Sequence, residues 1–318
     1  MSAGISSVAQ TGFANASSYD THRPSYPHEA VNVLVDRLGI SGLTDAKVID
    51  LAAGTGKFTE LLAAREEGFD ILAVEPHEGM RNELAKKGLK NVRVADGTSD
   101  KIPSEDGDVD ALVAAQAFHW FSNEASLKEI HRALRPGGIF GMIWNIEDCD
   151  YPSHSLPKEA GLRASQHRPS NHENMLIRFP LAADNQTKSW QTKTKWESDL
   201  RTITWSFDDK HPRFRHEQWR RVFEEQAPSI SLLSLPARPQ FSLPLGENLT
   251  HWTVWLTPEK VWERYRTLSQ IAILEGEEKE RVMEKFFRII KDGEDVERND
   301  KGEVALHGVT LAAWTSRV

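Results

Sequence analysis

The amino-acid sequence predicts an α/β fold, with a mostly parallel sheet that has helices on both faces. From residue 47 to residue 144, short apolar runs alternate with segments of helical periodicity. Such alternation is typical of parallel strands joined by crossover helices. A second observation is the end of the first apolar run, 47–51, where small residues allow a tight turn and let a ligand lie on backbone amides at a helix start. These small residues are Ala52, Ala53, Gly54 and Gly56.

The elements of this sheet are expected in chain order. Pro27 suits the first turn of a helix, because its ring fixes φ near the helical value, and apolar residues then recur at helical spacing from Ala30 to Leu38. Strands are expected where apolar residues run together between polar ones, at 48–51, 71–74, 92–94, 108–115 and 139–144. Helices are expected at 58–64, 77–87 and 123–134, the last ended by a turn at Arg135-Pro136-Gly137-Gly138.

The second half of the chain has a looser pattern. Most of the ten tryptophans follow residue 143, which indicates an apolar cavity or a lid. A strand is expected at 231–243, and Thr257 with Pro258 should start a helix as N-cap and first-turn proline. Further predictions are a helix at 277–290, a turn at 299–302 and a last strand at 309–314 that closes the sheet antiparallel.

Composition excludes several classes of function. The net charge of −8 repels polyanions, so neither nucleic acid nor an anionic membrane is expected as a partner. The stretch 211–221 mixes basic and aromatic residues, and it predicts either a solvated helix face or a contact to an anionic small substrate. The one cysteine, Cys149, permits no intramolecular disulfide, and the histidines lack metal-binding spacing, so no metal is expected. Without a signal sequence or a long apolar run, the chain is expected to be cytoplasmic.

Three kinds of nucleotide loop compete for residues 50–59. A phosphate-binding P-loop fails at both ends, because Leu51 stands at its first glycine and Phe58 at its magnesium-binding hydroxyl. A dinucleotide loop lacks its third glycine, since Gly56 is followed by Lys57-Phe58-Thr59. An acidic residue at the strand end followed by small-x-Gly-x-Gly remains.

That remaining pattern, Asp50-Leu51-Ala52-Ala53-Gly54-Thr55-Gly56, resembles the glycine-rich motif of class I S-adenosylmethionine-dependent methyltransferases. The resemblance is to the small-molecule type related to the ubiquinone and menaquinone biosynthesis enzymes, with Ala52 in place of the usual first glycine. It extends over residues 13–145 and includes a Tyr-x-x-x-Arg-Pro-x-Tyr-Pro segment at 19–27 and the run Phe-His-Trp-Phe at 118–121.

The resemblance implies a seven-stranded, Rossmann-like sheet and S-adenosyl-L-methionine as cofactor. It also implies a division of the chain into a flexible N-terminus at 1–18, a cofactor-binding core at 19–145, a substrate-side insertion that forms a helical cap at 146–229, and a segment at 230–318 that completes the sheet and adds lid helices.

Several residues are expected to contact this cofactor. Glu75 ends the second strand about 20 residues beyond the glycine loop, where a carboxylate can accept hydrogen bonds from both ribose hydroxyls. Asp50 is expected to orient the loop or the cofactor's ammonium group. The family also implies an adenine contact from Asp96 or Thr98. The remaining cofactor residues are expected to be Ala52, Gly54, Gly56, Gln116, Tyr19 and Arg23, the last two on an arm folded over the cofactor.

The chemistry expected is methyl transfer to an oxygen, nitrogen, sulfur or carbon atom of a small molecule. His119 lies just past the fourth strand and is the candidate catalytic residue, as a general base or as a group that orients the substrate. Two alternatives stay open. The chain could bind the cofactor without methyl transfer, or it could be a nicotinamide-dependent oxidoreductase, which also uses a glycine loop and an acid after the second strand. The oligomeric state is not predicted.

Overall fold

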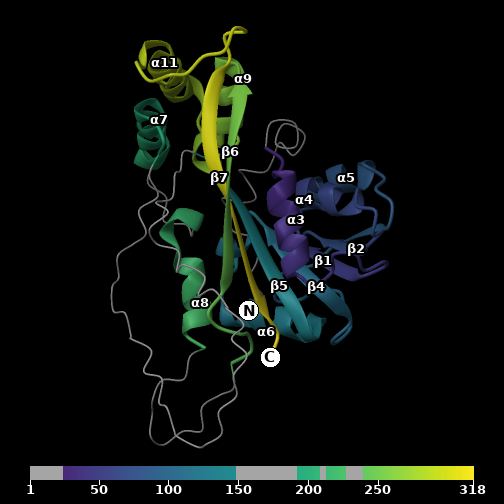
Figure 1. Ribbon diagram of the computed structural model, residues 1–318. Coiled ribbons are helices and arrows are strands. Elements are labelled where there is room, and N and C mark those ends of the chain that lie inside the picture. The colour runs from purple at the N-terminus through teal and green to yellow at the C-terminus, as the bar shows by residue number, and fades with distance from the viewer. Residues whose placement is uncertain (1–23, 148–191, 208–212, 227–238) are drawn as a thin grey trace, which may run out of the picture.

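The computed structural model describes residues 24–147, 192–207, 213–226 and 239–318. Within these residues lies a seven-stranded sheet of order β3-β2-β1-β4-β5-β7-β6, shown in Figure 1. The strands are β1 (Lys47–Leu51), β2 (Asp70–Val74), β3 (Val92–Ala95), β4 (Val109–Ala115), β5 (Leu134–Glu147), β6 (Gly246–Leu256) and β7 (Val304–Ser316). The first five pair in parallel, and β7 pairs antiparallel with both β5 and β6. The predicted fold class is therefore confirmed, including the antiparallel last strand.

Helices cover both faces of the parallel strands (Figure 1). One face carries α3 (His28–Arg37), α4 (Lys57–Ala63) and α5 (Glu78–Lys86), and the other carries α6 (Glu124–Ala133) and α8 (Arg221–Glu224). Burial on both faces explains why β1 carries Val48, Ile49 and Leu51, and four of its five positions are buried, the fourth being Asp50. The two faces have separate apolar cores, one built on α3 and α4 and the other on α6 and α8.

β6 and β7 continue beyond the other strands and carry a third core. They pair from Gly246–Trp314 to Leu256–Val304, whereas β5 reaches β7 only as far as Gly308. The helices α7 (Lys195–Ser206), α9 (Pro258–Tyr265), α10 (Ser269–Ala272) and α11 (Gly276–Asp292) gather at this overhang, at the top of Figure 1. Their buried residues form one cluster with the end of β7, which includes Trp196, Trp262, Phe286, Val304 and Leu306. We call these four helices the cap helices.

A buried carboxylate fixes α7 on β7. Glu197 has no solvent exposure, and one of its oxygens accepts hydrogen bonds from the backbone N–H and the ring Nδ1 of His307, at 2.8 and 2.9 Å. Its other oxygen accepts from the hydroxyl of Thr194, at 2.6 Å, as part of a capping box at the helix start. Because a buried carboxylate is costly unless hydrogen-bonded, this arrangement holds the helix to one position on the strand.

Four sequence-based predictions need correction. The run 135–138 belongs to the long strand β5, with an irregular register against β4, instead of forming a turn. The strand expected at 231–243 lies partly outside the described residues, and its described part, 239–243, holds only an isolated bridge at Phe241. The sixth strand is β6, whose polar residues hid it from an apolar-run criterion. The helix begun at Thr257 stops at Tyr265 and is followed by the separate α10.

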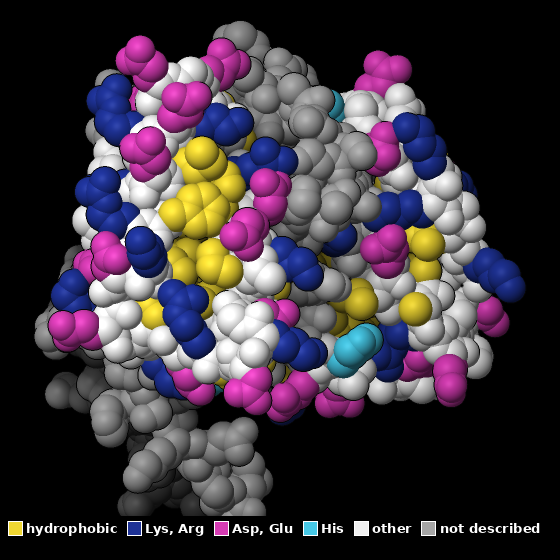
Figure 2. All heavy atoms as spheres, turned by 90° about the horizontal axis from the view of Figure 1, so that it is seen from above, with side chains coloured by type: hydrophobic (Ala, Val, Ile, Leu, Met, Phe, Trp, Pro, Cys, Tyr) yellow, Lys and Arg dark blue, Asp and Glu magenta, His cyan; other side chains and the backbone are white. Residues whose placement is uncertain are grey.

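The surface above the cap helices is apolar at its centre and carries charges of both signs around it (Figure 2). Large hydrophobic side chains exposed in this part of the chain include Trp205, Trp255 and Ile273. Among the described residues, no helix is long and apolar enough to span a bilayer.

Candidate functional site

The glycine loop between β1 and α4 uses backbone conformations that favour glycine. Gly54 and Gly56 have φ values of 59° and 86°, and Ala52 shares the left-handed region with a φ of 58°. At Gly56 the packing adds a second requirement, because a Cβ there would lie 2.2 Å from Cδ1 of Leu84 on α5. The tight turn predicted at the two glycines is therefore present, and the loop backbone at Gly56 also packs directly against α5.

Glu75 connects this loop to the end of β2. Its two carboxylate oxygens accept hydrogen bonds from the backbone N–H of Gly54, at 2.9 Å, and of His77, at 2.8 Å. Only 6% of the residue is exposed. Burial raises the pKa of the carboxyl, and the two N–H groups oppose that rise. The acid and the loop, 21 residues apart, therefore meet at the carboxyl ends of the strands.

Asp50 lies beneath the same loop with no solvent exposure. Its Oδ2 accepts a hydrogen bond from the hydroxyl of Thr59, at 2.6 Å, whereas Oδ1 is buried and has no hydrogen-bond partner in the part of the chain that the structure describes. Burial raises the pKa of the carboxyl to about 7; the Thr59 hydrogen bond opposes the rise, and the nearby Glu75 adds to it. A buried oxygen that lacks a donor is costly, so Asp50 is suited to a ligand that donates a hydrogen bond or brings a positive charge.

Arg81 is a residue that sequence reasoning missed. Its guanidinium donates to the backbone carbonyls of Glu75 and Pro76 and to Oδ1 of Asp96, at 2.9, 2.6 and 2.9 Å. It therefore fixes the turn after β2 against the turn after β3. A lone arginine on an amphipathic helix has no sequence pattern that would single it out.

The two candidate adenine contacts have different surroundings. The Asp96 side chain is 74% exposed and meets Arg81. The hydroxyl of Thr98 donates to the carboxylate of Asp100, at 2.6 Å. Asp96 therefore keeps acceptor capacity toward solvent, and the side chain of Thr98 is engaged locally.

The end of β4 is tied to the neighbouring strand β5. Gln116 has a φ of 56°, its backbone N–H donates to the carbonyl of Ile143, and its side-chain amide donates to the carbonyl of Asn145, at 2.8 Å in both cases. A short 3-10 helix, Phe118–Trp120, follows. This arrangement fixes the direction in which the chain leaves the sheet toward His119.

His119 is held by an indole. Trp144, buried on β5, donates from its Nε1–H to Nδ1 of His119, at 3.2 Å. An indole nitrogen can only donate, so Nδ1 is the acceptor and the ring proton of the neutral imidazole lies on Nε2. Trp144 in turn packs on Trp219 and Phe214, with ring centroids 4.6 and 4.9 Å away.

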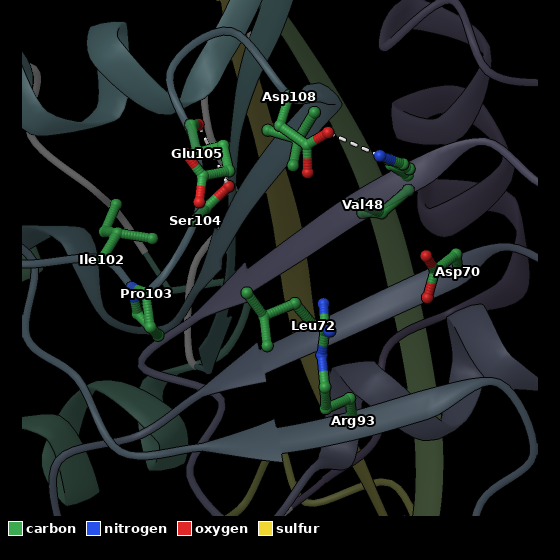
Figure 3. Close-up of a pocket in the computed structure, with 11 residues that line it drawn as sticks. Val48, Asp70, Leu72, Arg93, Ile102, Pro103, Ser104, Glu105 and Asp108 are labelled. Carbon is green, nitrogen blue, oxygen red and sulfur yellow. Dashed lines mark hydrogen bonds and ion pairs between the residues drawn. The ribbon is translucent and has the colours of Figure 1, made fainter.

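A pocket of about 530 Å³ lies away from the glycine loop, and Figure 3 shows the residues that line it. Its lining includes Lys47 and Asp70, the first residues of β1 and β2, and Lys47 forms an ion pair with Asp108 at 2.5 Å. These residues are at the amino ends of the strands, opposite the glycine loop. The pocket is therefore separate from the candidate site.

The structure brings together most, but not all, of the predicted residues. Asp50, the glycine loop and Glu75 meet directly, and Gln116 and His119 follow β4 at the same sheet edge. Tyr19 and Arg23 lie outside the described residues. Among described side chains, no group of three or more histidine, cysteine or acidic residues could hold a metal ion.

Comparison with known proteins identifies the type of domain. Residues 49–142 match the family described as "Methyltransferase domain". An uncharacterized methyltransferase of Schizosaccharomyces pombe is 37% identical over 145 residues, which cover 46% of this chain and 56% of that protein. An uncharacterized methyltransferase of Mycobacterium bovis is 40% identical over 131 residues, which cover 41% of this chain and 50% of that protein. The chain thus spans about half the length of these curated relatives.

The fold comparison agrees. A solved Anabaena variabilis protein, described as a methyltransferase from an antibiotic biosynthesis pathway, superposes with a TM-score of 0.50 at 16% identity and covers 92% of this chain and 98% of its own. The predicted resemblance to class I S-adenosylmethionine-dependent methyltransferases is confirmed, and with it S-adenosylmethionine as the family's cofactor. The closer relation to quinone-biosynthesis enzymes stays a prediction. The unpartnered Asp50 oxygen and the loop amides fit a cofactor that has both an ammonium group and hydroxyls.

Proposed function

We propose that the chain transfers the methyl group of S-adenosylmethionine to a small molecule, because residues 49–142 match the methyltransferase domain family. The observation that supports this most directly is the hydrogen bond between the Gly54 N–H and the Glu75 carboxylate. It joins the glycine loop to the acid after β2 and so forms one polar surface at the carboxyl edge, where sheets of this type bind ligands.

Each residue of this surface has a role in the proposal. Glu75 accepts the ribose hydroxyls with the lone pairs that its two backbone N–H donors leave over. Asp50 faces the positively charged methionine end with its unpartnered oxygen. Asp96, held by Arg81, accepts from the adenine amine. S-adenosylmethionine supplies a methyl group already activated by its sulfonium, so the chain has to align the acceptor and exclude water.

His119 acts in this proposal as an orienting donor. Because its Nδ1 accepts from Trp144, the neutral ring presents an N–H at Nε2 and has no lone pair there to take a proton. We therefore favour the orienting role over the general base. Uniform ¹⁵N labelling tests this directly, since the two ring nitrogens of each tautomer have distinct chemical shifts. A protonated Nδ1 with an unprotonated Nε2 in the neutral ring would refute the orienting role.

The experiment for the function has two arms. Calorimetry should show binding of S-adenosylhomocysteine, and labelled S-adenosylmethionine incubated with a metabolite extract should give a product heavier by one methyl group. Cofactor binding with no product from any extract would favour the silent binding module. Binding of reduced nicotinamide cofactor in place of S-adenosylhomocysteine would favour the oxidoreductase.

The partners follow from the same proposal. The surface in Figure 2 mixes charges of both signs, which gives no continuous basic area for a nucleic acid. We propose a small-molecule acceptor that enters on the side of the cap helices, and a cytoplasmic location.

A further inference from the structure

A buried ion pair joins the cap helices to the sheet. Arg264 on α9 donates from Nε to Oε1 of Glu147, the last residue of β5, at 2.5 Å, and the two side chains are 8% and 11% exposed. The second carboxylate oxygen of Glu147, Oε2, is buried and accepts no hydrogen bond from the described residues. A buried acceptor without a donor carries a substantial desolvation cost, so this position calls for an explanation.

The ion pair is shaped by its neighbours on three adjacent strands. Glu147 on β5 lies beside Gly308 on β7, which lies beside Trp252 on β6. A Cβ at Gly308 would come within 2.2 Å of the Trp252 ring, so only glycine lets the indole lie across β7. The Arg264 guanidinium then lies over that indole, 5.0 Å from its centroid.

A chain of hydrogen bonds leads from this cluster to the end of β4. The Trp252 indole donates to the hydroxyl of Thr310, at 3.1 Å, and that hydroxyl donates to the amide oxygen of Asn145, at 2.7 Å. The Asn145 carbonyl accepts from Gln116, whose backbone N–H meets Ile143. Glu147 lies four residues further along β5, about 13 Å at about 3.3 Å per residue.

This cluster separates two apolar cores on one face of β7. Val304 and Leu306 pack with the cap helices, whereas Ala312 packs with α3 and α4. Gly308 and Thr310 lie on the same face between these two cores. The polar groups there are the Thr310 hydroxyl and the side chain of Glu147, which lies beside Gly308. This polar gap between two apolar cores lies beyond the last pair of β4 with β5, which is Ala115 with Ile143.

We propose that Glu147 Oε2 and the Arg264 guanidinium bind a hydroxyl group of a neutral acceptor substrate. The hydroxyl would donate to Oε2 and accept from the guanidinium, which satisfies the buried oxygen. Glu147 and Arg264 carry opposite charges and form an ion pair, so the pair has no net charge. It therefore favours neither a carboxylate nor an ammonium group on the substrate. Glu147 lies about 13 Å along β5 from Ile143, the residue that Gln116 meets at the end of β4. This hydroxyl is therefore a recognition group and not the methyl acceptor. The inference rests on the proposed function and specifies the substrate of the same site.

Three fragments of one skeleton test the proposal on the full chain: benzyl alcohol, benzoate and benzylammonium. The readout is the ¹H–¹⁵N resonance of the Trp252 indole, assigned with Trp252→Phe, in titrations with and without S-adenosylhomocysteine. Benzyl alcohol should move this resonance at lower concentration than either ion. If benzoate or benzylammonium binds the wild-type protein more tightly than benzyl alcohol does, the proposal is overturned, and no substituted protein is needed for that conclusion.

A substitution locates the hydrogen bond. Glu147→Gln should weaken benzyl alcohol binding by about 10- to 100-fold, the range for a hydrogen bond to a charged group. Glu263→Gln, which alters the partly buried pair of Glu263 on α9 with Arg266, is the matched control and should leave the affinity unchanged. Unchanged affinity in Glu147→Gln would overturn the assignment.

If Glu147→Gln does not fold, the double variant Glu147→Gln with Arg264→Gln removes both charges and should show the same loss. The outcomes also separate the inference from the proposed function. Binding of S-adenosylhomocysteine without alcohol binding at Trp252 overturns the inference alone. Alcohol binding without S-adenosylhomocysteine binding overturns the proposed function and leaves the hydroxyl site in place.

Discussion

Replacing Asp50 by asparagine should make the unliganded protein more stable at neutral and alkaline pH. The carboxyl is fully buried, and burial raises its pKa from 3.8 to about 7. A carboxyl whose pKa is higher in the folded state prefers the fold in its neutral form. Its stabilising contribution is therefore complete below about pH 4 and is lost as pH rises to about 7.

The size of this effect follows from the two pKa values. The difference between 3.8 and about 7, at about 1.4 kcal/mol per pKa unit, corresponds to about 4 kcal/mol over the whole range. Between pH 5 and pH 8, the linkage relation gives a fall of about 2–3 kcal/mol. Asparagine has nearly the same shape and cannot ionise, so Asp50→Asn should lack this fall.

Urea unfolding of both proteins at pH 5, 6, 7 and 8 measures the difference. The free energy of unfolding of Asp50→Asn should exceed that of the wild type by an amount that grows with pH. Asp70→Asn, at an exposed position at the start of β2, is the matched control and should track the wild type. A difference between Asp50→Asn and wild type that is constant across this range would refute the reasoning.

The same protonation should affect ligand binding. A cationic cofactor end favours the charged carboxylate, so binding of S-adenosylhomocysteine to the wild type should release a proton from Asp50 and strengthen between pH 6 and pH 8. Calorimetry in buffers of different ionisation enthalpy counts that proton. Asp50→Asn should bind with no such release.

Three further predictions concern the loop and the cap helices. Glu75→Ala should weaken S-adenosylhomocysteine binding by about 1.5–3 kcal/mol, measured by calorimetry, with the fold retained; unchanged affinity would remove the residue from the site. Gly56→Ala should lower the free energy of unfolding by about 1–3 kcal/mol, because of its φ of 86° and the clash with Leu84, and an unchanged urea midpoint would contradict this. Glu197→Ala should cost about 3–5 kcal/mol, as for a broken buried pair, whereas Asp199→Ala, exposed on the same helix, should stay within about 0.5 kcal/mol; equal losses would show that Glu197 does not anchor α7.

The sequence alone was sufficient for elements whose signals are local. Three apolar residues of β1, followed by small residues, specify the strand and its loop, because a strand buried on both faces is mostly apolar. Thr257 caps α9 as predicted, since an N-cap hydroxyl bonds an N–H only three residues away, here that of Lys260. The turn at Asn299 is likewise confirmed by hydrogen bonds from its close neighbours.

The sequence pattern of a segment failed to predict its structure where that structure depends on pairing with a strand distant in the sequence. β6 has a single buried residue, Thr250, and no long apolar run, although half-buried and exposed positions alternate from His251 to Leu256. Its pairing with β7 along its whole length makes it a strand. The run 135–138 has turn residues, and although it is part of β5 it has no partner in the register with β4, which passes from Val109–Leu134 to Ala111–Ile139. It is therefore a bulge, whose place inside a strand depends on the paired residues before and after it.

For the candidate site too, some residues could be predicted from the sequence and some contacts could not. Asp50, the glycine loop and Glu75 could be predicted from sequence, because a strand end followed by a turn fixes where their backbones point. That Glu75 also binds the loop N–H, and that Trp144 sets the tautomer of His119, depended on residues 21 and 25 positions apart. The pair of Glu147 with Arg264 spans 117 positions. Contacts at such separations are made by the packing of whole elements, and this packing leaves no periodic pattern in the chain from which they could be read.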